Sequence, residues 1–296
     1  MGNFFIRIKQ SFAEGNILTK LIYINVGIFL LVRLSIVCFQ LFEIEPMAFF
    51  SYLQVPSSFV LFFHRPWTLL TYMFLHADFL HLLFNMLWLY WFGRMAMEFF
   101  NGRQLAGIYI SGGVAGALMY MLAYNLFPYF RNREMVAFLM GASASVMAIV
   151  FAVSLYRKDY ELQLMFIGRI RLLYLAFFAF IIDFLSITSD NAGGHIAHIG
   201  GALWGALFAF RLKQGKDLTV YLNRLIDRIV DIRKRRRPRM KVTPGGGRRP
   251  ETDQEYRARK QAESQALDAI LDKLKRSGYE SLSSEEKKTL FDASKK

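Results

Sequence analysis

The sequence predicts an all-α, polytopic membrane protein: a bundle of six transmembrane helices followed by a small helical or disordered soluble tail. The first observation is composition, because the 296-residue chain is 54% hydrophobic and 16% aromatic. The second is that several apolar runs approach the roughly 20 residues that cross a bilayer. The third is segregated charge: residues 211–250 hold 14 Lys/Arg against 3 Asp/Glu, directly after the last apolar run.

The apolar runs divide the chain. The candidate spans are residues 20–41, 79–99, 105–127, 136–156, 171–187 and 195–212. The last two are short, but a short helix can cross where the bilayer thins locally. The predicted parts are an N-terminal segment (1–19), a membrane domain (20–212), a basic flexible linker (213–250) and a small helical tail (251–296).

Basic residues mark one side of the predicted bundle. They precede the first span, separate the second from the third and the fourth from the fifth, and follow the sixth (Arg7, Lys9, Lys20, Arg94, Arg103, Arg157, Lys158, Arg169, Arg171, Arg211, Lys213, Lys216). The positive-inside rule makes this side, and both termini, cytoplasmic. The basic linker fits attraction to anionic membrane lipids better than to nucleic acid, so no nucleic-acid partner is expected. Cys38, the single cysteine, cannot form an intrachain disulfide.

The tail carries helix signals of its own. Leu267, Ile270, Leu271 and Leu274 recur at helical spacing. Gly278 could end that helix, and a capping box beginning at Ser283 could start another. We expect a small helical hairpin.

Ser143 is a polar residue inside the fourth apolar run, in Gly141-Ala142-Ser143-Ala144. If Gly141 and Ala142 form an extended turn and the helix begins at Ser143, its first N–H groups can stabilise a developing oxyanion. The alternative is a small residue at a helix contact, since Ala144, Ala148 and Ala152 form a small-residue face.

His198 lies near the start of the sixth run, and Gly201 and Gly205 share its helix face. A glycine face admits a close neighbour. If that neighbour is the alanine face of the fourth helix, the imidazole can reach Ser143 and act as general base. The alternative is a hydrogen bond that only bridges helices.

His81 and Asn85 lie four residues apart on one face of the second predicted helix. Two converging hydrogen-bond donors suit an oxyanion hole. The alternative is that hydrogen bonds between helices satisfy the polar groups of both side chains. Asp183 could be a third member of a catalytic triad, but a capping or structural role near the outer helix end fits it as well. For His195 and His76 we expect structural bonds to loop backbone.

Together these residues resemble the rhomboid family of intramembrane serine proteases. The resemblance covers roughly residues 20–212: a Gly-x-Ser motif at Ser143, a histidine among small residues at His198, and His-x-x-x-Asn at His81. The run from Arg65 to His76 is similar to the family's entry to the second helix. Each motif alone is weak, but their order and spacing are specific.

The resemblance implies a Ser–His dyad without a carboxylate and without a cofactor or metal. Ser143 would be the nucleophile and His198 the general base and acid, with the Ser143 N–H, His81 and Asn85 as the oxyanion hole. The substrate would be a transmembrane segment of another protein, cut near its outer end after local unwinding. The family also implies a mobile loop at about Thr188–Gly194. The bacterial type of family member would lie in the cell membrane, with its cytoplasmic tail outside the resemblance.

Three positions depart from the family pattern, namely Ala144 for a glycine, Met147 for a frequent aromatic and Thr68 for a frequent arginine. None removes a reacting group. Two other functions stay open: a non-catalytic rhomboid-like protein that binds membrane helices, and a haem or transport protein using His81 and His198. The full Ser/His/Asn set disfavours the first of these, and no haem-attachment motif supports the second.

Overall fold

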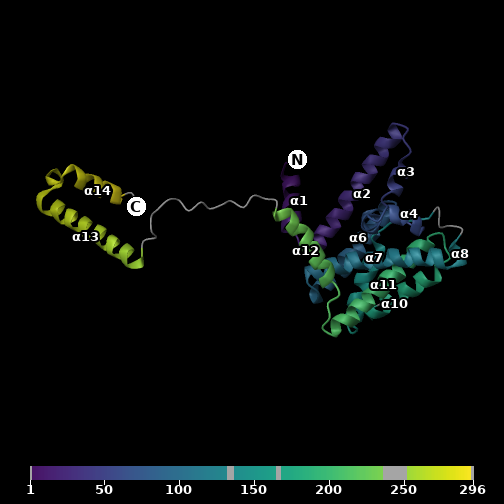
Figure 1. Ribbon diagram of the computed structural model, residues 1–296. Coiled ribbons are helices and arrows are strands. Elements are labelled where there is room, and N and C mark those ends of the chain that lie inside the picture. Colours follow the sequence, from purple (N-terminus) through teal and green to yellow (C-terminus); the bar gives the residue numbers. More distant parts are fainter. Residues whose placement is uncertain (1, 132–136, 165–167, 236–251, 295–296) are drawn as a thin grey trace. The chain divides into compact units, whose positions relative to one another are not determined.

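A computed structural model of the chain describes residues 2–131, 137–164, 168–235 and 252–294. The chain forms two compact units, residues 1–237 and residues 238–296 (Figure 1). The predicted linker crosses this boundary, and its residues 236–250 lie outside the described part.

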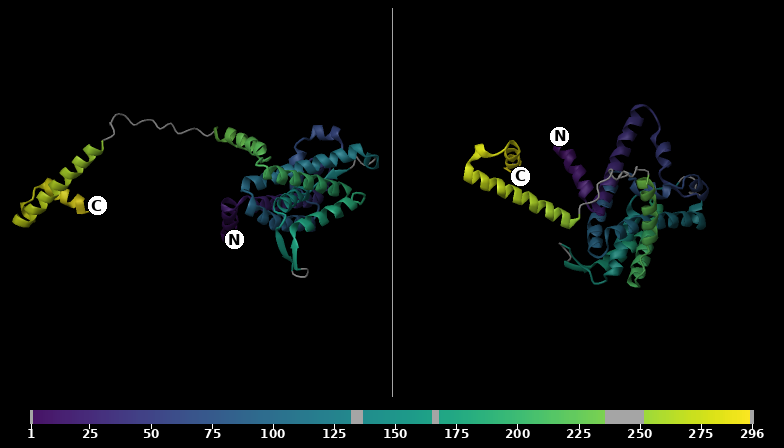
Figure 2. Two further views of the ribbon diagram at one scale, coloured as in Figure 1. Left: turned by 90° about the horizontal axis from the view of Figure 1, so that it is seen from below. Right: turned by 60° about the vertical axis from the view of Figure 1, so that its left-hand side comes forward.

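The first unit is built from helices. The long ones are α1 (Gly2–Glu14), α2 (Ile17–Leu41), α6 (Phe79–Phe99), α7 (Gly102–Leu126), α9 (Ser143–Tyr156), α10 (Leu172–Leu185), α11 (Ala192–Lys213) and α12 (Val220–Arg235). Short elements connect them: α3 (Pro46–Ser51), β1 (Val55–Pro56), α4 (Phe59–His64), α5 (Thr68–Thr71), η1 (Tyr72–Phe74), α8 (Pro128–Arg131), β2 (Phe138–Leu139), β3 (Glu161–Leu164) and β4 (Gly168–Arg171). The antiparallel hairpin β3–β4 projects from the bundle in the left view of Figure 2.

A helix occupies each of the six predicted spans, namely α2, α6, α7, α9, α10 and α11. Within the described residues, α2 and α7, of 25 residues each, are long and apolar enough to cross a membrane. Helices α9 and α10 are apolar but have only 14 residues each. Helix α9 begins at Ser143, seven residues after the predicted start of the fourth span at residue 136. The difference arises because residues 138–139 are extended and form β2.

Helix α9 forms the centre of the unit, with all its residues from Ala144 to Ser154 buried. It packs on α6, α7 and α11, and α7 and α11 run side by side in Figure 1. Small residues permit this packing: a Cβ added at Gly201 would overlap the carbonyl of Ala144, and one at Gly205 would overlap that of Ala148. The predicted contact between the glycine and alanine faces is therefore confirmed.

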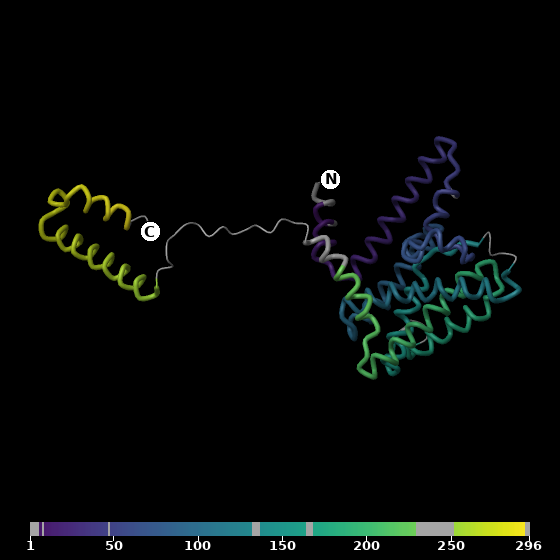
Figure 3. The backbone as a smooth tube through the Cα atoms, viewed as in Figure 1, coloured from purple at the N-terminus to yellow at the C-terminus, as the bar shows by residue number. Residues whose placement is uncertain are grey.

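Helices α2 and α10 lie at the periphery. The first half of α2 buries Leu18, Leu21 and Phe29, whereas the second half leaves its apolar side chains exposed and diverges from the bundle (Figure 3). Helix α10 likewise exposes a row of aromatic and aliphatic residues (Tyr174, Phe177, Phe178, Ile181, Phe184, Leu185). Exposed apolar surface of this extent is suited to lipid rather than to water.

Residues 42–78, between α2 and α6, are ordered by aromatic and polar contacts. The Trp67 indole donates a hydrogen bond to the Tyr52 carbonyl at 2.8 Å, and the Arg65 guanidinium lies 3.6 Å from the centre of the Tyr52 ring. Strand β1 pairs with β2 in register Val55–Leu139. This segment therefore fixes the chain that leads into α9.

The predicted flexible linker is only partly correct, because α12 occupies its residues 220–235. Asp227 accepts a hydrogen bond from Arg103 at 3.0 Å, and Asp217 accepts one from Gln104 at 3.0 Å, so both acids bind the start of α7. Thr219 packs against Gly107. The basic composition suggested a solvated chain, but apolar residues at helical spacing between the charges favour a helix.

The second unit is a helical hairpin of α13 (Asp253–Ser277), the single turn η2 (Tyr279–Ser281) and α14 (Ser284–Ser294). Helix α13 ends at Gly278, whose φ of +77° suits glycine, and Glu286 closes a capping box with Ser283. Lys273 binds Glu286 at 2.9 Å between the helices. The helix end at Gly278 and the start at Ser283 agree with the sequence prediction.

Candidate active site

A cavity of about 810 Å³ lies among α6, α9, α10 and α11. Its polar lining includes Asn85, Ser143, Asp183 and His198. The remaining wall is mostly apolar and aromatic (Phe84, Trp88, Trp91, Phe92, Met95, Val146, Met147, Leu162, Leu175, Phe178, Ala179, Ile182), with Gln163 from the β3–β4 hairpin. Three residues predicted to act together therefore share one largely apolar cavity.

Ser143 is the first residue of α9, so the condition that the helix begins there is met. The turn before it is not fully extended, because Ala142 has helical backbone angles, φ −77° and ψ −9°. Gly141 precedes it with φ +128°, a conformation suited to glycine, and donates its N–H to the Tyr72 carbonyl at 3.0 Å. No side chain caps the helix at Ala142. Because the first N–H groups of a helix have no acceptor within it, those around Ser143 remain available to a bound anion.

His81 lies against this turn. Its ring atoms Cε1 and Nε2 lie 3.0 Å from the position that a Cβ on Gly141 would occupy, and the Ser143 hydroxyl oxygen lies 3.6 Å from the same point. The Ala77 N–H donates to Nδ1 of His81 at 3.3 Å. A neutral imidazole that accepts at Nδ1 carries its hydrogen on Nε2, so His81 can donate toward Ser143.

Asn85 lies one turn further along α6 and is 7% exposed. Its amide donates to the His81 carbonyl at 2.8 Å, a bond within the helix. Because an amide has two N–H hydrogens, one remains for a group bound in the cavity. The Asn85 amide therefore binds the backbone of His81 and not its imidazole ring, so this hydrogen bond does not join the two side chains.

His198 faces α10 through its Nδ1 atom, which lies 2.9 Å from Oδ1 of Asp183. His195, three residues earlier, places its own Nδ1 2.8 Å from the same oxygen. The expectation that His195 bonds loop backbone is therefore wrong. Asp183 contacts the histidine of the predicted dyad, although the resemblance implies a dyad without a carboxylate.

Two features of the sequence could have indicated the contact with Asp183. It is the one ionisable carboxylate or base in α10, and a charge within an apolar helix needs a partner. His195 and His198 are spaced to share one helix face. Within the described residues, these three side chains also form a group whose ligand atoms lie within 4.8 Å of one another, as a metal site would require. Each Nδ1 already has the carboxylate as its partner.

The loop before α11 is shorter than predicted. Helix α11 begins at Ala192, so Gly193 and Gly194 belong to its first turn rather than to a mobile loop. A Cβ at Gly193 would lie 2.8 Å from the Tyr120 ring, which shows how closely this turn is packed. Small residues here permit close approach of α7 rather than movement.

The three departures from the family pattern have visible contacts. Ala144 packs beneath Gly116 and Gly201, Met147 lines the cavity, and the Thr68 hydroxyl donates to the Arg65 carbonyl at 2.7 Å. None displaces a polar residue of the cavity.

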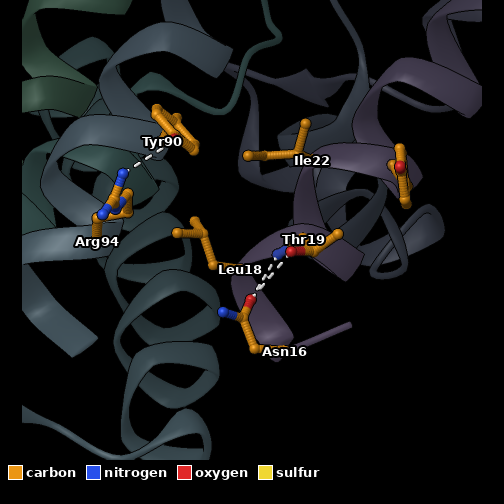
Figure 4. Close-up of a pocket in the computed structure, with 7 residues that line it drawn as sticks. Asn16, Leu18, Thr19, Ile22, Tyr90 and Arg94 are labelled. Carbon is orange, nitrogen blue, oxygen red and sulfur yellow. Dashed lines mark hydrogen bonds between the residues drawn. The ribbon is translucent and has the colours of Figure 1, made fainter. Parts of the chain in front are cut away.

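A second hollow of about 400 Å³ lies between the start of α2 and the far half of α6 (Figure 4). Asn16 caps α2 by accepting from Thr19, and Arg94 donates to the Tyr90 hydroxyl at 3.1 Å. Its described lining has an arginine and hydroxyl groups but neither a histidine nor a carboxylate. The paired acid–base groups lie in the first cavity.

The sequence of the chain matches the family model of the Rhomboid domain over residues 64–215, just over half its length. The chain belongs to the rhomboid family. This rhomboid protein is a membrane protein, and the matched region contains His81, Asn85, Ser143, Asp183 and His198.

Two further similarities concern a relative and the tail. Over 158 residues, the chain is 28% identical to the RHOMBOID-like protein 12, mitochondrial, of Arabidopsis thaliana. The aligned region covers 50% of this chain and 47% of that protein. The chain thus spans about half the length of this relative. Residues 251–296 match a family of unknown function, DUF6576, so the second compact unit corresponds to a recognised sequence module.

Proposed function

We propose that this rhomboid protein is an intramembrane serine endopeptidase that cleaves transmembrane segments of other membrane proteins. The observation that carries the proposal is the shared cavity, in which Ser143, His198 and Asn85 meet from three helices. A hydroxyl alone is a weak nucleophile, and it needs an adjacent base and a site for the developing oxyanion. Family membership supports this reaction class.

In the proposed reaction, Nε2 of His198 accepts the Ser143 proton while Oγ attacks the scissile carbonyl carbon. The carbonyl oxygen becomes an oxyanion held by the Ser143 N–H and by donors from His81 and Asn85. Collapse of this intermediate breaks the C–N bond, and the imidazolium gives its proton to the leaving amine. Water then hydrolyses the acyl-enzyme by the same route in reverse.

The apolar walls of the cavity support a membrane-embedded substrate. Trp88 and Trp91 of α6 face one side, and Phe178 and Ile182 of α10 face the other. An intact helix keeps its carbonyls in its own hydrogen bonds, so a substrate segment must unwind near Ser143 before attack. We place the six helices of the predicted spans (α2, α6, α7, α9, α10 and α11) across the bilayer of a bacterial cell membrane, with both termini cytoplasmic and the scissile bond near the outer side.

The direct test uses purified protein and a model single-span substrate. Ser143→Ala and His198→Ala should each abolish cleavage, and a fluorophosphonate probe should label the wild type at Ser143 but not the Ser143→Ala protein. Cleavage by either variant at the wild-type rate would reject the dyad. A wild-type protein that binds the substrate helix without labelling or cleavage would instead support a non-catalytic rhomboid-like protein.

A further inference from the structure

Asp183 is a buried carboxylate in α10, a helix whose other residues are all apolar or aromatic. Helix α10 reads Leu-Leu-Tyr-Leu-Ala-Phe-Phe-Ala-Phe-Ile-Ile-Asp-Phe-Leu, and Asp183 is 7% exposed. An ionised group taken from water into such surroundings is costly unless hydrogen bonds satisfy it. Its neighbours should therefore show what keeps it there.

Both of its partners are imidazoles of α11. Oδ1 of Asp183 lies 2.8 Å from Nδ1 of His195 and 2.9 Å from Nδ1 of His198. A carboxylate oxygen only accepts hydrogen bonds, so each Nδ1 carries a hydrogen and donates it. A neutral His198 ring is then protonated on Nδ1 and has its lone pair on Nε2.

This tautomer is the one that the proposed reaction needs. With Nδ1 held by α10, Nε2 is the nitrogen that can take the Ser143 proton. When it does, the ring becomes a cation beside the Asp183 carboxylate, which stabilises the charge without itself taking the proton. Removing the carboxylate would leave the ring free to adopt the other tautomer and to rotate.

We propose that Asp183 is a positioning residue, which holds His198 in the Nδ1–H tautomer, while His195 donates to the same oxygen and fixes the carboxylate. The inference rests on the proposed function and departs from a dyad that lacks a carboxylate. His195, three residues from His198, reaches Asp183 from the same helix face, with the two rings 5.9 Å apart and nearly perpendicular. Asp183 is thereby oriented by two donors from a single rigid helix.

The test compares Asp183→Asn, Asp183→Glu and His195→Asn with the wild type in detergent, using the full chain. Asp183→Asn keeps the size of the side chain but removes its charge, and its amide can donate to Nδ1 and impose the wrong tautomer. We expect kcat to fall by up to about 10⁴-fold, the scale on which the same change of a histidine-orienting carboxylate acts, with KM little changed. Asp183→Glu should recover part of kcat, and His195→Asn, which keeps a donor, should lose less than Asp183→Asn.

Two further measurements separate positioning from a structural role. Thermal unfolding should show that the Asp183→Asn protein remains folded, and its rate of labelling by a fluorophosphonate should fall in parallel with kcat. A folded Asp183→Asn protein with wild-type kcat and labelling rate would overturn the inference. So would wild-type activity that EDTA abolishes and Zn²⁺ restores, because a metal would then occupy both Nδ1 atoms. A wild type that neither cleaves nor labels would instead refute the proposed function.

Discussion

The His81 ring lies in tight contact with the position that a Cβ atom would occupy at Gly141. Its Cε1 and Nε2 atoms are both 3.0 Å from the Cβ position of Gly141, and the Ser143 hydroxyl oxygen is 3.6 Å from it. A glycine at position 141 therefore leaves room for the proposed oxyanion donor beside the proposed nucleophile. Backbone strain adds to this requirement, since φ is +128°.

Gly141→Ala should strongly reduce activity. The methyl group would displace the His81 ring, and the strained backbone would shift the start of α9, so we expect fluorophosphonate labelling to slow by at least about 10²-fold, the scale of losing one oxyanion donor. Gly215→Ala is the matched control, because Gly215 also has positive φ, +77°, but its Cβ position meets nothing within 4 Å. It should lose about 1 kcal/mol of stability and keep its labelling rate. Equal labelling of both variants would contradict the proposed role of His81.

Asn85→Ala should lower kcat by about 10²–10³ and leave KM nearly unchanged, because an oxyanion donor acts in the transition state. Steady-state cleavage of the model substrate measures this split. Asn125→Ala provides the control, since Asn125 on α7 makes the same bond to a carbonyl one turn back, Met121 at 2.7 Å, and also binds the Ser57 carbonyl. Its loss should lower the unfolding temperature and spare kcat. A change in KM alone for Asn85→Ala would assign it to substrate binding.

Gly201→Ala should destabilise the bundle and weaken catalysis together. The methyl group would overlap the Ala144 carbonyl, forcing apart the helices that carry Ser143 and His198. Overpacking of this kind costs about 1–3 kcal/mol. Gly27→Ala in α2 meets nothing within 4 Å and should be neutral or stabilise by up to about 1 kcal/mol. Thermal unfolding and labelling of both proteins in detergent would reveal a wrong assignment if Gly201→Ala matched Gly27→Ala.

Sequence patterns were most informative where the spacing of small or capping residues marked one helix face or one helix end. The glycines after His198 predict a close helix contact, and they meet the alanine face of α9. The capping box at Ser283 likewise predicts a helix start. These are local or repeating signals, and both can be identified without knowledge of the tertiary fold.

The sequence could suggest that Asp183 has a histidine partner, but it could not show the contact itself. Its distance from His198 depends on how α10 leans on α11, which periodicity does not determine. The sequence analysis also missed α12, because the high charge of this segment drew attention away from the apolar residues that pack on α7. It predicted too long a loop before α11, because a glycine such as Gly193 is as consistent with flexibility as with close packing. The six-helix pattern was predictable, whereas side-chain partners between helices were not.

Removing the tail should leave the stability of the first compact unit unchanged only if the cut follows α12. Removing residues 238–296 deletes a unit that is compact by itself, so labelling and cleavage of a detergent-solubilised substrate should remain at the wild-type level. Cutting after Lys213 also removes the Asp217–Gln104 and Asp227–Arg103 bonds and the packing of Thr219 on Gly107.

The shorter protein should therefore unfold at a lower temperature, although its Ser143 chemistry should survive while it stays folded. The Asp227 bond is exposed and contributes little, about 0–1 kcal/mol, so most of the loss should come from Thr219 and Asp217. The point variant Thr219→Ala in the full chain tests this division, because it should reproduce part of the destabilisation. If the cut after residue 237 abolished labelling of a folded protein, the tail would have to act on the active site directly.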